Sequence, residues 1–322
     1  MIRTEKRFPL WAKLICDALA LGVFLLTFAY FHHVMPRKTV VVGTKTNITS
    51  PAVTEAPPPE TDTNGQTETE PPDTVVIEDG RYANKNVSVT VEKYTINKAD
   101  DIITYFVADI RVKSALFIKT AFANDTYGVG YYERIRPMAK RNGAIVAISG
   151  DFYGAFGSKE EIYNLVLRNG MIYSPLVSDG DVAVLYADGE FAVYSPNEVD
   201  LNELVERGAW QAWNFGPILV KDGEVPKKFN STSYVNKKHP RCGIGWYEPG
   251  HYCFVVVDGR QDGYSTGATI AEFADIFKSL GVADAYNLDG GRSAAMTMYG
   301  EYVNIPWGDS RPICDIIYVG EE

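Results

Sequence analysis

Three aspartates follow apolar runs and are flanked by glycine, a pattern typical of a ligand-binding edge in a sheet. They are Asp151, Asp258 and Asp289. Ligands collect at the carboxyl ends of strands in α/β sheets, and glycine lets the backbone turn there and bring N–H groups close to a ligand. Arg260 and Arg292 stand two and three residues beyond their aspartates, so each can clamp a phosphate through paired N–H donors. The pattern indicates chemistry on a phosphate-bearing substrate.

The segment around Asp289 is too elaborate for a simple turn. Most Asp–Gly pairs only close a hairpin, and that role suffices for Asp188 and Asp222. For Asp258 the turn and the functional interpretation both stay open. Asp289 differs, because a two-residue turn needs neither the asparagine before it nor the Gly-Gly-Arg-Ser after it. The flanking residues that share this prediction are Asn287, Gly290, Gly291 and Ser293.

A strand–helix–strand unit must position two of these aspartates. Cys253–Val257 and Ala285–Leu288 are apolar runs, and each ends in an Asp–Gly corner. Between them a helix is predicted to begin at Thr269, because apolar residues then recur at helical spacing. Glu272 completes a capping box with Thr269, and Gly281 supplies the stop.

The remaining elements predict a mixed domain. Strands are expected at 87–94, 102–110 and 144–149, hairpin turns at 169–170, 188–189 and 222–223, and helices at 131–142 and 197–207. Arg241 opens a further strand that runs toward the aspartate corners. We therefore predict an α+β (mixed α/β) fold with a central, mostly antiparallel or mixed sheet and flanking helices.

The N-terminal segments predict a membrane-anchored protein. Residues 1–13 carry basic side chains, 14–35 form an apolar run of about the length of a transmembrane helix, and 36–74 are rich in Thr, Pro and Glu. We expect a cytoplasmic N-terminus, a single-pass signal-anchor, a disordered stalk and a domain at 75–322 outside the cell. A cleaved signal peptide is the alternative, although no small-residue cleavage site follows the run.

Composition excludes some partners and cofactors. The net charge is −10 and the isoelectric point about 5.0, which argues against nucleic acid but not against an anionic substrate met by local arginines. The domain's only histidines are His239 and His251, too few for a histidine-built metal site. Cys242 and Cys253 could pair across a hairpin. Because no glycine-rich nucleotide fingerprint is present, we expect no cofactor.

Several motifs together resemble those of the phosphodiester glycosidase family. They are Asn287–Met296, Ser149–Gly154, Pro240–Gly245 and Asp309–Pro312, in the family's order and within a match from Val87 to Val319. The chain departs from the family pattern at several places. Arg292 replaces a glycine, and Ala294 and Ala295 replace hydroxyl residues. Ser149 stands where asparagine is common, and Cys242-Gly243 stands where Thr-Ala is common.

The resemblance implies hydrolysis of a sugar-1-phosphodiester, such as an N-acetylglucosamine-1-phosphodiester. This chemistry needs a carboxylate near the anomeric carbon and positive charge on the departing phosphate. On this resemblance, Asp289 or Asp151 is expected to be the general base or nucleophile. Asp258 is a further catalytic candidate. The phosphate-clamp candidates are Arg241, Arg260, Arg292 and Arg311, and Asn287 and Ser293 would orient the sugar or the Asp289 loop.

Location suggests cell-envelope glycopolymers or exopolysaccharide as the substrate, because the anchor and stalk of a bacterial protein would face the wall. A second hypothesis is a non-catalytic domain that binds surface polysaccharide, which Ala294 and Ala295 favour. A third makes the aspartates an oxygen-only Ca²⁺ or Mg²⁺ site in a metal-dependent enzyme.

Overall fold

The computed structural model describes residues 16, 19–23, 25, 44–45, 76–78, 80–98, 101–153 and 164–320. The chain divides into two compact units, residues 1–39 and 40–322, and the second contains all of the described strands. Most of the predicted anchor at 14–35 and stalk at 36–74 lies outside the described residues. Within the described part of the chain, no helix is long and apolar enough to cross a membrane.

Three sheets hold the described strands, and all of their pairings are antiparallel. The large sheet has the order β13 (Ile218–Val220), β16 (Asp284–Leu288), β14 (Arg241–Glu248), β15 (His251–Val257), β5 (Asp101–Val112), β4 (Val87–Lys98), β3 (Arg81–Ala83), β2 (Val76–Glu78). The second has the order β1 (Thr44–Lys45), β9 (Met171–Ser174), β8 (Val166–Arg168), β12 (Ala209–Trp213), β10 (Val182–Tyr186), β11 (Phe191–Tyr194). The third has the order β18 (Glu301–Tyr302), β17 (Met296–Met298), β7 (Val146–Ser149), β19 (Asp315–Val319), β6 (Ile118–Phe122).

Helices are few and short in the described part of the second unit. Its α-helices are α2 (Ile135–Arg141), α3 (Leu201–Glu206) and α4 (Ile270–Leu280). The 3₁₀ turns are η2 (Ala115–Phe117), η3 (Ala123–Asp125), η4 (Pro196–Glu198), η5 (Gly291–Ser293) and η6 (Trp307–Asp309). The fold is therefore mostly β. The predicted antiparallel pairing is confirmed, but the expectation of one central sheet with flanking helices was wrong.

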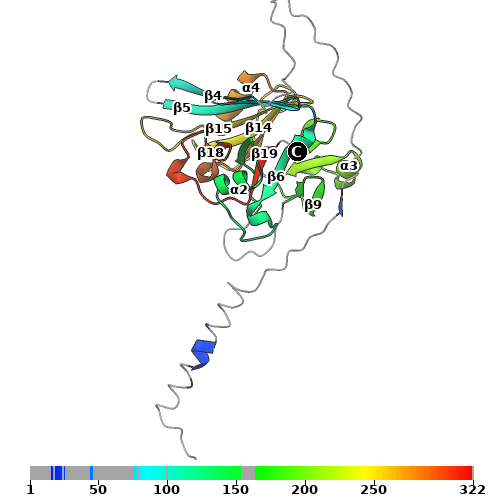
Figure 1. Cartoon of the computed structure of the whole chain (residues 1–322), viewed down its shortest axis with the longest axis vertical. Coiled ribbons are helices and arrows are strands. Elements are labelled where there is room, and N and C mark those ends of the chain that lie inside the picture. Colours follow the sequence, from blue (N-terminus) through cyan, green and yellow to red (C-terminus); the bar gives the residue numbers. More distant parts are fainter. Residues whose placement is uncertain are drawn as a thin grey trace, which may run out of the picture. The chain divides into compact units, whose positions relative to one another are not determined.

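The large sheet is buried on both faces at β15. Cys253, Val255 and Val257 of β15 pack with α4 on one face, whereas Tyr252, Phe254 and Val256 face the main core. That core joins the large sheet to strands of the other two sheets, and Figure 1 shows α4 against the side of the large sheet away from β6 and β19. Double burial explains why β15 is an unbroken apolar run rather than an alternating one.

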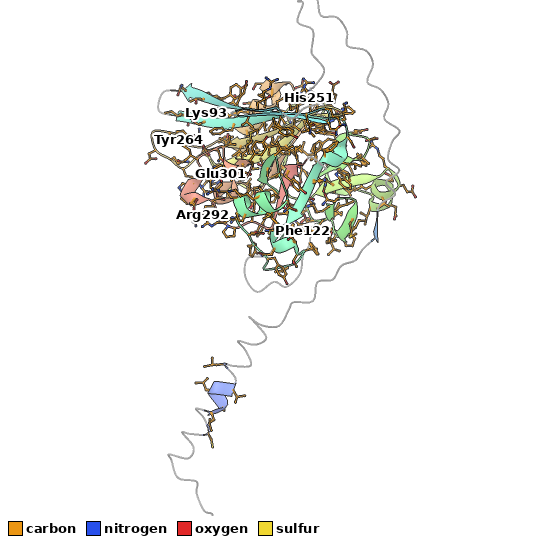
Figure 2. The ribbon with its side chains drawn as sticks, viewed as in Figure 1. Lys93, Phe122, His251, Tyr264, Arg292 and Glu301 are labelled. Carbon is orange, nitrogen blue, oxygen red and sulfur yellow. The ribbon has the colours of Figure 1, made fainter. Side chains whose placement is uncertain are left out.

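The predicted strand–helix–strand unit is confirmed. The side chain of Thr269 caps Glu272, Glu272 bonds back to Thr269, and Gly281 ends α4 with φ of 80°. Because β15 and β16 are both antiparallel to β14, which lies between them, they run parallel to each other. Their carboxyl ends therefore share one edge. That edge lies on the side of Tyr264 and Arg292, away from His251 at the start of β15 (Figure 2).

Several local expectations were corrected. Thr44 and Lys45, inside the predicted stalk, form β1 on the edge of β9, because two extended residues can pair with a free edge without a core of their own. Asp222 closes a tight turn in which Lys221 donates to Glu224, but no strand follows it. The predicted hairpins at 169–170 and 188–189 are confirmed.

The two helices predicted from periodicity are shorter than expected. The first, α2, covers 135–141 of the predicted 131–142, and α3 covers 201–206 of 197–207. Cys242 and Cys253 are free. They cannot approach each other, because Cys242 faces the main core and Cys253 faces α4 on the opposite side of the sheet.

Candidate active site

The candidate active site lies where the end of β16 meets the end of β7. The N–H of Asp289 donates to the carbonyl of Gly150 at 3.0 Å, which joins two of the predicted aspartate corners. Gly150 must be glycine, because a Cβ there would lie 2.3 Å from a carboxylate oxygen of Asp315. The corner therefore packs Asp151 and Asp289 on neighbouring turns of backbone.

Asp289 is held by one arginine. Nη2 of Arg311 donates to both carboxylate oxygens of Asp289, at 3.1 and 2.9 Å, and Nε of Arg311 donates to the hydroxyl of Ser293 at 2.6 Å. Burial raises the pKa of Asp289, and the positive charge of Arg311 opposes that rise. The guanidinium of Arg311 also lies 5.7 Å from the ring centre of Phe152. Three of the predicted site residues are thus brought together as one unit.

Asp151 belongs to a buried charged triad. Nη2 of Arg168 lies 3.3 Å from Oδ2 of Asp151, and Nε of Arg168 lies 2.8 Å from Oδ2 of Asp315. All three side chains are at most 1% exposed. The N–H of Asn214 donates to the same oxygen of Asp151 at 3.2 Å. A buried arginine shared by two acids offsets part of the cost of desolvating them.

The second oxygen of Asp151 has no such partner. Oδ1 is buried and makes no hydrogen bond within the described residues. Burial is the main cause that raises the pKa of Asp151 to about 6, and Arg168 opposes the rise. A carboxyl group with one unpartnered oxygen and a pKa near neutrality can exchange a proton with a group that reaches this oxygen.

Arg168, Asp315 and Asn214 were not among the predicted site residues. Arg168 ends an apolar strand just before a predicted hairpin turn, and Asp315 opens the final strand. The available signal was a charged residue at the end of an apolar run, because such a residue is costly to bury unless it is paired. The partner could not be found this way, since 147 positions separate Arg168 from Asp315.

Asp258 lies on the same edge but is fully engaged with a neighbouring loop. Its carboxylate accepts from the hydroxyl of Tyr264 at 2.9 Å, from Nδ2 of Asn304 at 2.7 Å and from the N–H of Ile305 at 3.0 Å. Burial raises its pKa, and these donors oppose the rise. The geometry makes Asp258 an attachment point for the chain segment that leads to η6.

Arg241 also donates its hydrogen bonds to backbone carbonyls. Its Nε donates to the carbonyl of Ala268 at 2.8 Å, and its Nη2 donates to the carbonyls of Val235 and Lys237, both at 2.6 Å. Burial lowers the pKa of Arg241 to about 10. The side chain is only 4% exposed, so it fastens the loop before β14 rather than facing solvent.

Arg260 and Arg292 meet at an exposed tryptophan. Their guanidinium carbons lie 4.7 and 5.9 Å from the ring centre of Trp307, which is 37% exposed. Nη2 of Arg260 donates to Nδ1 of His239 at 2.9 Å, and this contact requires a neutral His239. Burial lowers the pKa of His239, which keeps it neutral. Within the described residues, neither guanidinium forms an ion pair with a carboxylate.

The glycines after Asp289 allow close packing on the strand start at 240–241. A Cβ on Gly290 would lie 2.8 Å from the carbonyl oxygen of Pro240, and Gly291, with φ of 60°, donates its N–H to that oxygen at 2.8 Å. Asn287 donates Nδ2 to the carbonyl of Gly216 at 2.7 Å, while its buried Oδ1 has no partner in the described chain.

Two departures from the family pattern are core residues beside the site. Ala294 and Ala295 are at most 2% exposed and pack in hydrophobic clusters. Ser293 keeps its contact with Arg311. In the described part of the chain, no three His, Cys, Asp or Glu side chains gather as a metal-binding group.

Comparison with known proteins places the chain in a family. The family model described as phosphodiester glycosidase matches residues 142–320, more than half of the chain. This protein belongs to the phosphodiester glycosidase family. The matched span contains both charged units, the Asp289–Arg311 pair and the Asp151–Arg168–Asp315 triad.

Three individual proteins are similar to this chain. The SPbeta prophage-derived uncharacterized protein YomE of Bacillus subtilis is 32% identical over 200 residues, which cover 60% of this chain but only 30% of YomE. The zebrafish N-acetylglucosamine-1-phosphodiester alpha-N-acetylglucosaminidase catalytic domain, auto-inhibited by its pro-peptide, is 18% identical, with a TM-score of 0.57 over 73% of this chain and 84% of that domain. A hypothetical protein from Synechocystis is 13% identical, with a TM-score of 0.50 over 73% and 62%. At these identities the two structures show that the phosphodiester glycosidase fold is shared.

Proposed function

We propose that this phosphodiester glycosidase domain hydrolyses the bond between the anomeric carbon of a sugar and a phosphodiester. The observation that carries the proposal is the junction of β7 and β16. There an arginine-held carboxylate, Asp289, lies one backbone hydrogen bond from the Asp151 corner, whose carboxyl has one unpartnered oxygen. Two carboxylates and nearby guanidiniums are the groups that this chemistry requires.

Asp151 is the proposed general base. Its pKa of about 6 lies close to neutral pH, which suits a general base. Oδ1 takes a proton from water as the water oxygen bonds to the anomeric carbon. The bond from that carbon to the phosphate oxygen breaks, and its electron pair leaves with the phosphate. The products are a free sugar and a phosphomonoester.

Asp289 is the proposed stabiliser of positive charge at the anomeric carbon. Arg311 fixes the carboxylate through both oxygens and is itself fixed by Ser293. Such fixation places the charge before the reaction begins, which avoids reorganisation during the step. Asn287, with its open Oδ1, is the proposed acceptor for a donor group of the sugar.

Arg260 and Arg292 are the proposed phosphate clamp. Both guanidiniums lie over Trp307, and neither is neutralised by a carboxylate within the described residues. A Cβ on Gly291 would lie 3.4 Å from Nη2 of Arg260, so the clamp borders the Asp289 loop. Arg241 and Asp258, whose polar atoms are engaged elsewhere, act as positioning residues for the loops that carry the clamp.

Cell-envelope glycopolymers or exopolysaccharide are the proposed substrates, at the outer surface of a membrane. The support is the N-terminal sequence, with basic residues before the apolar run at 14–35 and a Thr, Pro and Glu-rich segment at 36–74. A non-catalytic glycan-binding domain is less well supported, because Ala294 and Ala295, which favoured it, are core residues.

The test is release of free reducing sugar from a panel of N-acetylglucosamine-1-phosphodiesters by the full-length chain. Asp289→Asn removes the proposed charge, and Asp188→Asn is the matched control, because Asp188 is an exposed Asp–Gly corner whose carboxylate only accepts from Glu190 of its own turn. We expect release by the wild type and the control and at least a 100-fold loss in Asp289→Asn. Full activity of a folded Asp289→Asn protein would refute the assignment.

A further inference from the structure

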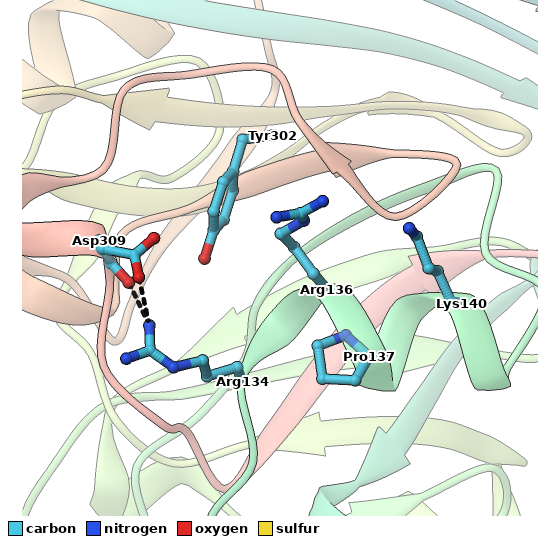
Figure 3. A pocket seen from close by; sticks show the side chains of 6 residues that line it. All are labelled: Arg134, Arg136, Pro137, Lys140, Tyr302 and Asp309. Atoms are coloured by element: carbon cyan, nitrogen blue, oxygen red, sulfur yellow. Dashed lines mark hydrogen bonds and ion pairs between the residues drawn. The ribbon is translucent and has the colours of Figure 1, made fainter.

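A pocket with several charged side chains in its lining lies beside α2. It is lined by Arg134, Arg136, Pro137, Lys140, Tyr302 and Asp309 and has a volume of about 280 Å³ (Figure 3). Three of these side chains are cations that come from one short segment, residues 134–140. In Figure 3 the side chains of Arg136 and Lys140 point the same way from α2, toward the side of the pocket where Tyr302 lies. The whole domain is acidic, so this grouping of cations is local.

The cations of this α2 pocket form ion pairs that are exposed to solvent. Arg134 lies 3.0 Å from Oδ2 of Asp309, and Lys140 lies 2.5 Å from Glu301, which also pairs with Arg136. The side chains in these pairs are 42–77% exposed. Exposed pairs of this kind contribute little, about 0–1 kcal/mol each. Three cations share two carboxylates, so one positive charge is left for a ligand.

A phosphate group can replace those carboxylates. Charge-assisted bonds from arginine to phosphate are shorter and stronger than neutral ones, and they can be paired. Tyr302 adds an apolar wall, since its ring centre lies 5.4 Å from the guanidinium carbon of Arg136. The pocket therefore fits a phosphate attached to a sugar or polyol rather than a bare metal or an apolar group.

The α2 pocket is joined to the candidate active site by one short segment. Arg134 donates to the backbone carbonyl of Asp309, and Arg311, two residues along, holds Asp289. Two residues of extended chain span at most about 7 Å. The pocket and the proposed reaction centre are thus neighbours along the 309–311 backbone.

We propose that the α2 pocket binds a second phosphate of the same substrate molecule, one repeat away from the bond that is cleaved. The proposal rests on the proposed function and narrows its substrate class to polymers with repeating phosphodiesters. Arg134, Arg136 and Lys140 precede the part of the chain that the family model matches, whereas Tyr302 and Asp309 lie inside it.

The first experiment compares two substrates in the full-length protein. One is a trimer of N-acetylglucosamine 1-phosphate units, and the other is a monomeric N-acetylglucosamine-1-phosphodiester with one phosphate. The test variant is Arg136→Gln/Lys140→Gln. The matched control is Arg207→Gln/Lys278→Gln, which removes two surface cations that likewise pair with exposed glutamates, Glu190 and Glu224.

The expected result is a fall of about 10-fold in the ratio of kcat/KM for trimer to that for monomer in the test variant, through KM. The control should keep the wild-type ratio. Using a ratio within each protein removes differences in the folded fraction. An unchanged ratio in the test variant, or an equal fall in the control, would overturn the proposal.

A binding experiment separates this proposal from the proposed function. Titration of inorganic tripolyphosphate into the wild type should give binding that weakens about 10-fold in the test variant and not in the control. If no donor is hydrolysed but this loss is seen, the reaction is wrong and the anion site stands. If hydrolysis is seen without this loss, the second subsite is wrong. Co-sedimentation with phosphatidylglycerol vesicles is the last arm. If it is lost when Arg136 and Lys140 are replaced, and the wild type shows no preference for the trimer, the α2 pocket binds a lipid surface and the proposal is overturned.

Discussion

Replacing Asp151 by asparagine should remove activity and, at neutral pH, relieve a cost in stability. The carboxyl group is buried, and its pKa is raised from 3.8 to about 6. Between these values the folded protein keeps a proton that the unfolded chain has lost. Stability therefore falls as pH rises through this window.

The size of the effect follows from the pKa difference. For each pH unit between pH 3.8 and about 6, the free energy of unfolding falls by about 1.4 kcal/mol. Ionising Asp151 in the folded protein therefore lowers it by ~3 kcal/mol in all. Below pH 4 this cost is absent, and above about pH 6.5 it is complete. Asparagine keeps the shape of the side chain and cannot titrate, so Asp151→Asn lacks this dependence.

The assay is chemical denaturation of wild-type and Asp151→Asn protein at several pH values from 4 to 8. The difference in free energy of unfolding should shift by ~3 kcal/mol in favour of the variant as pH rises. Titrating groups outside the triad, such as Asp284, whose pKa burial also raises to about 6, are present in both proteins and cancel in the difference.

Two results would contradict this account of Asp151. A difference that stays constant from pH 4 to 8 would show that Asp151 does not titrate in this window. Retained hydrolysis would show that it is not the base, since loss of a general base costs about 100-fold or more. A protein that is relatively stabilised at pH 8 and inactive is the expected signature of a residue kept for chemistry.

Three further predictions follow from the same contacts. Arg311→Lys should lower kcat about 100-fold, because lysine cannot hold both Asp289 and Ser293. Steady-state kinetics would measure this, and an unchanged kcat would contradict it. Trp307→Ala should raise KM about 5-fold while thermal melting stays the same, since the ring is exposed and supports two guanidiniums; a large drop in melting temperature would point to a core role instead. Asn304→Ala should lower the free energy of unfolding by about 1–3 kcal/mol, because Asp258 loses a buried donor. Denaturation curves that superimpose on those of the wild type would refute this prediction.

Local signals predicted the parts of the site that depend on neighbouring residues. The capping box at Thr269, the glycine stop at Gly281 and the apolar runs on either side placed Asp258 and Asp289 at one edge. These features depend on spacing within about a dozen residues, where helical and strand periodicity is informative. Arg311 and Asp289 were both predicted site residues, but the contact between them was not predicted.

Long-range pairing was beyond the same reasoning. Strand periodicity identifies strands but not their partners, so one sheet was predicted where there are three. Arg168 and Asp315 have no local pattern that marks them as a pair. Arg241 and Asp258 show the converse. Their residue types predicted chemistry, whereas the surrounding backbone carbonyls and donors use up their polar atoms.

The position of β19 in its sheet determines when the charged units can form during synthesis. This last strand lies between β7 and β6, both made much earlier, and it begins with Asp315, four residues after Arg311. A chain still emerging from the ribosome has Asp151 and Arg168 but lacks the residues that complete the two charged units. The two charged units are therefore complete only once β19 has inserted between β7 and β6.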